Sequence, residues 1–149
     1  MNDVMQFVGF RIGQAAYALP IAAVREIVRP PEITAVPQSA DDLAGVMNLR
    51  GRIVPVIDLR KRFQQASVNT PKSRVLVMSL DANLVGMLVD SASEVLKIAS
   101  AEIEPGPNLL GDSQESYVTG VAKYNGRLVV VLDPKKLLPQ AERSELATA

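Results

Sequence analysis

The groups that could do chemistry in this chain are carboxylates, amines and phenols, because its 149 residues include neither histidine nor cysteine. The commonest general base and the commonest thiol nucleophile are therefore absent. Asp58 with Glu26 or Asp90 is the acid pair that we weigh as a catalytic candidate. No spaced acid pair and no phosphate-cradling loop supports it. We therefore predict no catalytic residue, no metal and no cofactor, and an enzyme is only a remote alternative.

Asp58 has a counterpart in Asp133, and a structural role explains both. Each follows an apolar run and precedes Leu59-Arg60 or Pro134-Lys135. This context is typical of a carboxylate that caps the next helical turn. We expect two caps and not a catalytic dyad.

The positions of these two residues follow an internal repeat. Residues 45–59 recur at 120–134, with Gly, Val, Gly, Arg, two further Val and Asp coinciding at an offset of 75. Residues 21–27 and 89–95 match at an offset of 68, and each carries a penultimate glutamate, Glu26 and Glu94. A repeat of this length predicts two packed copies of one small unit, the second with a longer loop in 105–116. We expect a single domain over about 5–140, with units over about 5–65 and 72–140, and a flexible tail at 141–149.

The elements that carry these residues are predicted to be strands. Hydrophobic residues make up 48% of the chain and aromatics 4%, so Val, Ile, Leu and Ala must fill the core, a composition that favours sheet. Apolar spacing predicts a helix over 21–28, with a strand over 24–28 as the alternative. The polar segment 64–73 predicts a mobile connection, and short helices are expected at 60–63 and 134–138. Hairpins are predicted for 4–12 with 15–19, 43–49 with 52–59, 74–80 with 84–89, and 117–124 with 127–132.

Charge and hydropathy exclude several classes of partner. Sixteen basic and sixteen acidic residues cancel, so the positive field that nucleic acid or an anionic membrane requires is missing. A small barrel that binds nucleic acid is a remote alternative for this reason. The amino terminus has no signal-peptide pattern, and no apolar run approaches about 18 residues. We expect a cytoplasmic protein without direct membrane insertion.

Several motifs, in this order, resemble the CheW-type chemotaxis coupling proteins, a family of adaptors with a CheW-like domain. The resemblance covers roughly 5–140 and is most specific at Asn48-Leu-Arg-Gly51 followed by Ile53-Val-Pro-Val-Ile-Asp-Leu-Arg60. The other matching segments are Phe7-Val-Gly-Phe-Arg-Ile-Gly13, Tyr17-Ala-Leu-Pro-Ile21, Val24-Arg-Glu-Ile27, Val85-Gly-Met-Leu-Val-Asp90 and Gly120-Val.

The resemblance implies a mainly β fold of two five-stranded SH3-like barrels related by a pseudo-twofold, with short helices and terminal strands that can be exchanged between barrels. It also implies a non-enzymatic scaffold that couples the cytoplasmic tip of methyl-accepting chemotaxis proteins to the regulatory domain of the histidine kinase CheA. Such a protein would be recruited to membrane-associated receptor arrays through its partners and be a monomer when free. Flagellar, pilus-based and other chemosensory pathways use similar adaptors, so an adaptor of a non-flagellar pathway is the alternative.

The same resemblance places receptor contacts on the first copy of the repeat, and leaves the kinase contact on the exposed edge of one barrel without named residues. The second copy reads Lys123-Tyr-Asn-Gly126 and lacks the signature. Without the resemblance, three of these positions have structural explanations. Val24 would be a core residue, Gly45 a glycine required by the backbone conformation, and Glu26, which recurs as Glu94, a carboxylate that accepts hydrogen bonds from backbone N–H groups. The predicted receptor-binding residues are Val24, Glu26, Gly45, Asn48, Leu49, Arg50 and Gly51.

Overall fold

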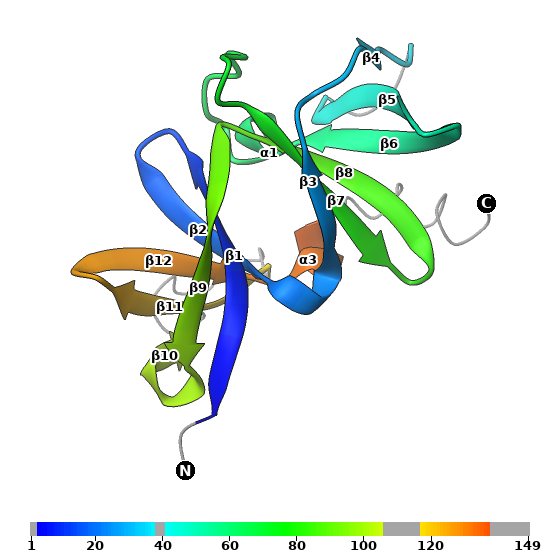
Figure 1. Ribbon diagram of the computed structural model, residues 1–149. Helices are drawn as coiled ribbons and strands as arrows, with labels where there is room; N and C mark the ends of the chain where they lie inside the picture. Colours follow the sequence, from blue (N-terminus) through cyan, green and yellow to red (C-terminus); the bar gives the residue numbers. More distant parts are fainter. Residues whose placement is uncertain (1–2, 38–40, 106–116, 138–149) are drawn as a thin grey trace.

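Two six-stranded sheets make up the computed structural model of the chain, which describes residues 3–37, 41–105 and 117–137 (Figure 1). We call the sheet with strand order β10-β11-β12-β2-β1-β9 the first barrel, and the sheet with order β3-β7-β8-β6-β5-β4 the second barrel. The first barrel comprises β1 (Val4–Ile12), β2 (Ala15–Pro20), β9 (Ser91–Ala99), β10 (Ile103–Pro105), β11 (Val118–Tyr124) and β12 (Arg127–Leu132). The second comprises β3 (Val24–Val28), β4 (Ile33–Thr34), β5 (Leu43–Leu49), β6 (Arg52–Asp58), β7 (Arg74–Leu80) and β8 (Asn83–Val89).

Each barrel combines strands from both halves of the chain. The hairpin β1-β2 joins the strands β9 to β12, and the hairpin β7-β8 joins the strands β3 to β6. In each case the two parts meet on both sides of the hairpin, through a parallel pair (β12 with β2, or β6 with β8) and through an antiparallel pair (β1 with β9, or β7 with β3). The two repeat units therefore exchange their first hairpins, which gives the molecule its pseudo-twofold arrangement.

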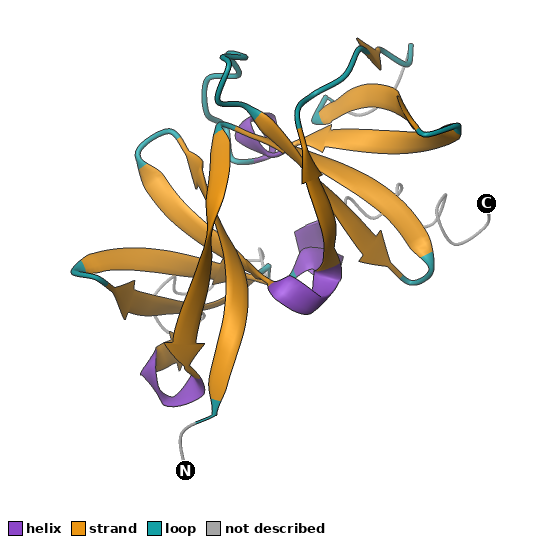
Figure 2. Ribbon diagram, in the orientation of Figure 1, coloured by secondary structure: helices purple, strands orange, loops and turns teal. Residues whose placement is uncertain are grey.

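Short helical turns connect the strands (Figure 2). They are α1 (Leu59–Arg62), α3 (Pro134–Leu137) and the 3₁₀ turns η1 (Ile21–Ala23) and η2 (Ser100–Glu102). The helix predicted over 21–28 is wrong, because only η1 is helical and β3 follows it. Along β3, half-buried and exposed residues alternate, which is the strand period, and β7 supplies the backbone partner. The alternative that we derived from the sequence, a strand over 24–28, is confirmed.

The two predicted helix caps are confirmed. Asp58 Oδ1 accepts a hydrogen bond from the Arg60 backbone N–H at 3.0 Å, and Asp133 Oδ1 accepts one from the Lys135 N–H at 3.0 Å. The backbone repeats as well, since Asp58 N donates to Asp42 O at 2.8 Å and Asp133 N donates to Tyr117 O at 2.7 Å. Both strands of the repeat thus end in the same local structure.

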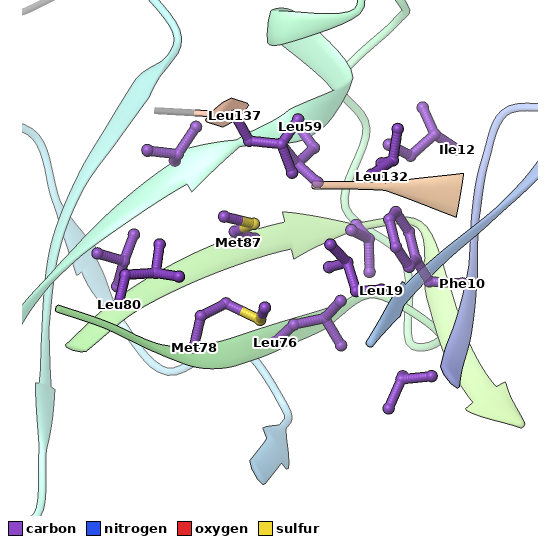
Figure 3. Packing of buried hydrophobic residues seen from close by; sticks show 14 residues of the cluster. Phe10, Ile12, Leu19, Leu59, Leu76, Met78, Leu80, Met87, Leu132 and Leu137 are labelled. Atoms are coloured by element: carbon purple, nitrogen blue, oxygen red, sulfur yellow. The ribbon is translucent and has the colours of Figure 1, made fainter. Parts of the chain in front are cut away.

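The largest apolar cluster lies between the barrels and not inside either one (Figure 3). One face of the hairpin β1-β2 contributes Phe10 and Leu19, and the matching face of β7-β8 contributes Leu76, Met78 and Met87. Two smaller clusters fill the barrel interiors, one around Phe7 and Ile98 and the other around Val54 and Val75. Because each hairpin buries one face in its own barrel and the other against its neighbour, the barrels share a core.

None of the described helices is both long enough and apolar enough to cross a membrane. The predicted tail at 141–149 and most of the predicted long loop lie outside the described residues.

Candidate protein-docking site

An ion pair joins the two charged residues that the motifs single out. Arg50 lies at the turn between β5 and β6, and Glu26 lies on β3 at the edge of the same barrel. Arg50 Nη1 donates to Glu26 Oε1 at 3.0 Å, and Arg50 Nη2 donates to Glu26 Oε2. The pair is bidentate, a geometry that the planar guanidinium provides and a lysine cannot. The Arg50 side chain is 69% exposed, so its remaining donors face solvent.

The backbone at Arg50 is strained. Arg50 has φ 49° and Gly51 has φ 88°, the pattern of a two-residue type I′ turn. The Gly51 N–H donates to Asn48 Oδ1 at 2.8 Å and fixes this turn. At the first position of such turns asparagine is favoured, and the second copy of the repeat has Asn125 there with φ 51°. An arginine in this left-handed conformation costs on the order of 1 kcal/mol.

Electrostatics keep this ion pair charged. The hydrogen bonds from Arg50 lower the pKa of Glu26 below its usual value. Reciprocally, the hydrogen bonds to Glu26, together with its charge, raise the pKa of Arg50. Glu26 therefore remains a carboxylate at any pH at which the protein would operate.

The ion pair borders a hollow of about 220 Å³, which we call the Arg50 corner. Three guanidinium groups and one carboxylate surround it, so it carries a net positive charge and can accept carboxylate or carbonyl oxygens. Its lining residues are Arg25, Glu26, Leu49, Arg50, Arg52, Val77 and Leu84.

The remaining predicted contact residues are distributed between the surface and the core. Asn48 and Gly51 are exposed beside Arg50, and Leu49 is buried to 8% exposure beneath the corner. Val24 is half-buried against the shared core and does not line the corner. Gly45 is buried under β4, where a Cβ would overlap the carbonyl oxygen of Thr34. The structure thus brings Glu26, Asn48, Leu49, Arg50 and Gly51 together and places Val24 and Gly45 apart from them.

Sequence reasoning missed a buried polar network around Arg60, which is 1% exposed. Arg60 Nε donates to Asp58 Oδ1 at 2.9 Å, and Arg60 Nη1 donates to Asp90 Oδ1 at 3.3 Å. Asp90 Oδ2 in turn accepts the Gly13 N–H, at 2.7 Å, from the β1-β2 turn of the first barrel. Arg60 therefore links both barrels. The available signal was Arg60 itself, the last residue of the strongest motif.

The Arg60 guanidinium also forms hydrogen bonds to the segment 64–73. Arg60 Nη1 donates to Val68 O at 2.8 Å and Arg60 Nη2 donates to Asn69 Oδ1 at 2.8 Å. The polar composition of this segment predicts mobility, whereas these contacts anchor its centre. With the bonds to Asp58 and Asp90, all five N–H donors of the buried Arg60 side chain are satisfied.

Comparison with known proteins supplies the family. The sequence model of the CheW-like domain matches residues 6–142. The chain belongs to this family. It is 36% identical over 138 residues to the chemotaxis protein CheW of Helicobacter pylori, covering 92% of this chain and 83% of that protein. It is 34% identical over 138 residues to CheW of Klebsiella aerogenes, with the same two coverages.

A solved structure supports the same family and fold. The scaffolding protein TtCheW from Thermoanaerobacter tengcongensis superposes with a TM-score of 0.81 at 31% identity, over 88% of this chain and 90% of that one. The predicted fold class and the predicted family are therefore confirmed, and so is the prediction of a chemotaxis scaffold. Each sheet has one strand more than the five expected, because the short edge strands β4 and β10 are added.

Proposed function

We propose that this CheW-like chain is a non-catalytic adaptor that binds the cytoplasmic tip of a methyl-accepting chemoreceptor and the regulatory domain of the histidine kinase CheA at the same time. The Arg50 corner supports this proposal most directly. It offers an exposed guanidinium, held by Glu26 on a strained turn, to an acidic or carbonyl-bearing surface. Nothing in this geometry requires the chain to perform a reaction.

The adaptor acts by holding its two partner proteins close to each other. Two proteins bound to one rigid scaffold meet at a far higher effective concentration than two proteins free in solution. Receptor movements change the contact energy between the receptor and the adaptor, and this difference shifts the kinase between its states. The shared core and the Arg60 network couple the two barrels, so a change at one barrel can reach the other. The chain works in the cytoplasm and reaches the membrane through the receptor.

Reversing one charge at the Arg50 corner tests the receptor contact. Arg50→Glu places two carboxylates together at Glu26 and removes the guanidinium, so we expect at least a tenfold loss of affinity for a purified receptor-tip fragment. Binding to the kinase regulatory domain should be unchanged. Lys123→Glu is the matched control, because Lys123 is exposed next to the equivalent turn of the first barrel.

The readout is a pull-down or calorimetric titration with each partner separately. If Arg50→Glu bound the receptor tip as well as the wild type, the Arg50 corner would not be the receptor site. If the wild type turned over a metabolite, or bound neither partner, the adaptor proposal itself would fail.

A further inference from the structure

A hollow of about 450 Å³ lies in the second barrel, where β3 ends and β7 begins. It shares no lining residue with the Arg50 corner. Arg29 and Arg74 are its charged lining residues, and none of the described residues that line it is acidic. Its apolar part comes from Pro30, Pro31, Ile33 and Pro71. The hollow therefore combines two positive charges with an apolar wall.

The strand register sets the two arginines opposite each other. Val28 of β3 pairs with Val75 of β7. One step further along the same register, Arg29 lies opposite Arg74. Side chains at directly opposite positions interact, and like charges there are destabilising. Neither arginine forms an ion pair with a described residue, so an anion between the two guanidinium groups would remove this repulsion.

The first barrel does not have two cations at the equivalent position. At the repeat offset of 68, Lys97 stands for Arg29 and Gln6 stands for Arg74. Gln6 and Lys97 pair in the ladder between β1 and β9, so this pair carries a single positive charge. The fold position itself therefore does not require two cations, and the repulsion is specific to the second barrel.

The Arg74 guanidinium is held in place by its own loop. Its Nη1 donates to Pro71 O at 2.9 Å and to Ser73 O at 2.7 Å. Its Nε and Nη2 form no hydrogen bond to a described residue, and this side of a guanidinium matches two oxygens of one anion. The loop is fixed in turn, because Arg60 Nη2 donates to Asn69 Oδ1 at 2.8 Å. Arg74 is thus oriented before a ligand arrives, which lowers the entropic cost of binding.

Neutral donors lie beside the two cations. Ser73 lines the hollow at 1% exposure, and its Oγ accepts the Thr70 N–H at 2.9 Å. The Ser73 hydroxyl donates to no described residue, although buried hydroxyl groups are normally satisfied. The Asn69 amide nitrogen also has no acceptor among the described residues, since only its Oδ1 is bonded, to Arg60. These donors suit the oxygens of an anion.

We propose that this hollow binds a small organic phosphate monoester, with the phosphate between Arg29 and Arg74 and the organic group against the prolines. A phosphate monoester carries about two negative charges at pH 7, which match the two guanidinium groups. The volume lies within the roughly 300–1,000 Å³ of small-molecule sites, so it has room for more than a phosphate. The proposal does not depend on the adaptor function or on the Arg50 corner.

The first experiment uses phenyl phosphate as the probe and the full chain in a phosphate-free buffer. In NMR titrations the methyl signals of Ile33 should shift, whereas those of Leu84 at the Arg50 corner should not. Inorganic phosphate and phenol, which each carry one part of the probe, should bind at least tenfold more weakly. The melting temperature should rise with the concentration of phenyl phosphate, because the ligand binds the folded state.

The second experiment removes one charge at a time. Arg29→Gln should weaken probe binding at least tenfold, and without ligand its melting temperature should equal or exceed that of the wild type, because the repulsion is gone. Arg74→Gln, which copies Gln6, should weaken binding as strongly. Arg25→Gln is the matched control, because Arg25 is an exposed arginine on the same strand that lines the Arg50 corner, and it should leave binding unchanged.

Loss of binding in both Arg29→Gln and Arg74→Gln, with the control intact, would support the site. Absence of probe binding, or full binding by Arg29→Gln, would overturn it. Equal binding of phenol would mean an apolar pocket, and equal binding of inorganic phosphate would mean an ion site without an organic group, so either result would overturn the assigned ligand class. Loss of binding in Arg25→Gln alone would place the anion at the Arg50 corner and would also overturn the proposal.

Discussion

Gly45 packs so closely against the backbone of Thr34 that a Cβ at position 45 would overlap the carbonyl oxygen of Thr34. Gly120 repeats this relationship with the carbonyl oxygen of Glu104 in the first barrel. In both barrels the glycine lets a short edge strand pair closely with its neighbour, β4 with β5 and β10 with β11. The recurrence of glycine at an offset of 75 therefore has a steric cause that is the same in both copies.

Gly45→Ala is expected to destabilise the fold rather than to act at a binding surface. The overlap with backbone forces β4 away from β5, and φ 145° adds strain, so the free energy of unfolding should fall by roughly 2 kcal/mol or more. Gly120→Ala should lower it by a similar amount. Gly126→Ala is the control, because its Cβ would meet nothing within 4 Å and only its φ of 79° is unfavourable, which costs about 1 kcal/mol. Chemical denaturation measures all three; Gly45→Ala with wild-type stability and lost receptor binding would contradict this expectation.

Arg50→Asn separates the contribution of the Arg50 side chain from that of its backbone. Asparagine suits φ 49°, as Asn125 shows, and this gain offsets the loss of a solvent-exposed ion pair, which contributes little to stability. The free energy of unfolding should therefore stay within about 1 kcal/mol of the wild type, while binding of the receptor tip falls at least tenfold. Thermal unfolding measures the stability, and a binding titration on the same sample measures the affinity for the receptor tip. Undiminished binding would show that the turn, and not the guanidinium, is recognised.

The local features of this fold could be predicted because they depend on neighbouring residues. The hairpins follow from alternating apolar runs and from Asn125-Gly126 or Arg50-Gly51 between them, and both glycines have positive φ. The caps at Asp58 and Asp133 follow from an acid before a short polar turn. The strand β3 was the exception, because its five residues fit helical and strand spacing equally well, and only pairing with β7 decides between them.

Features that depend on distant residues could not be predicted. The sequence around Arg60 does not show that its side chain is buried, since burial also requires Asp90, thirty residues away, and the folded-back segment 64–73, in addition to neighbouring Asp58. The joining of the two halves of the chain could not be predicted either, because it depends on the register of a parallel ladder in which Ala16 pairs with Val129. Of the candidate site, the sequence indicated Glu26 and Arg50 but not the salt bridge between them.

The Asp58–Arg60 pair predicts a pH dependence of stability. Burial, the largest single influence, raises the pKa of Asp58, but the hydrogen bonds from Arg60 and Ser67 together with the guanidinium charge outweigh it and lower that pKa. Because the pKa of Asp58 is lower in the folded state, its ionised form stabilises the fold fully at pH values above its unfolded-state pKa of about 3.9. This stabilisation is lost as the pH falls through the folded-state pKa. The free energy of unfolding should therefore decrease below about pH 4.

Asp58→Asn isolates this pair. At pH 7 the variant should lose roughly 3 kcal/mol, because Arg60 remains buried with Asp90 as its only carboxylate partner among the described residues. The difference from the wild type should shrink as the pH falls below about 4, because Asp58 then becomes protonated in the unfolded wild type, and at still lower pH in the folded protein, where its pKa is lowered. Urea denaturation at a series of pH values provides the measurement. A constant difference down to pH 2 would show that Asp58 does not titrate in this range.

The shared core predicts that the two barrels unfold as one unit. Leu19 of β2 has no exposed surface and belongs to the cluster that lies between the hairpins β1-β2 and β7-β8. Leu19→Ala should cost about 2–5 kcal/mol, whereas Leu128→Ala, at 69% exposure, should cost less than about 0.5 kcal/mol. In a denaturant titration followed by NMR, the signals of Val129 in the first barrel and Val54 in the second should disappear at one midpoint in both variants. Two separated midpoints would mean that each barrel is stable without its neighbour, and that the packing between the two hairpins is not required for either fold.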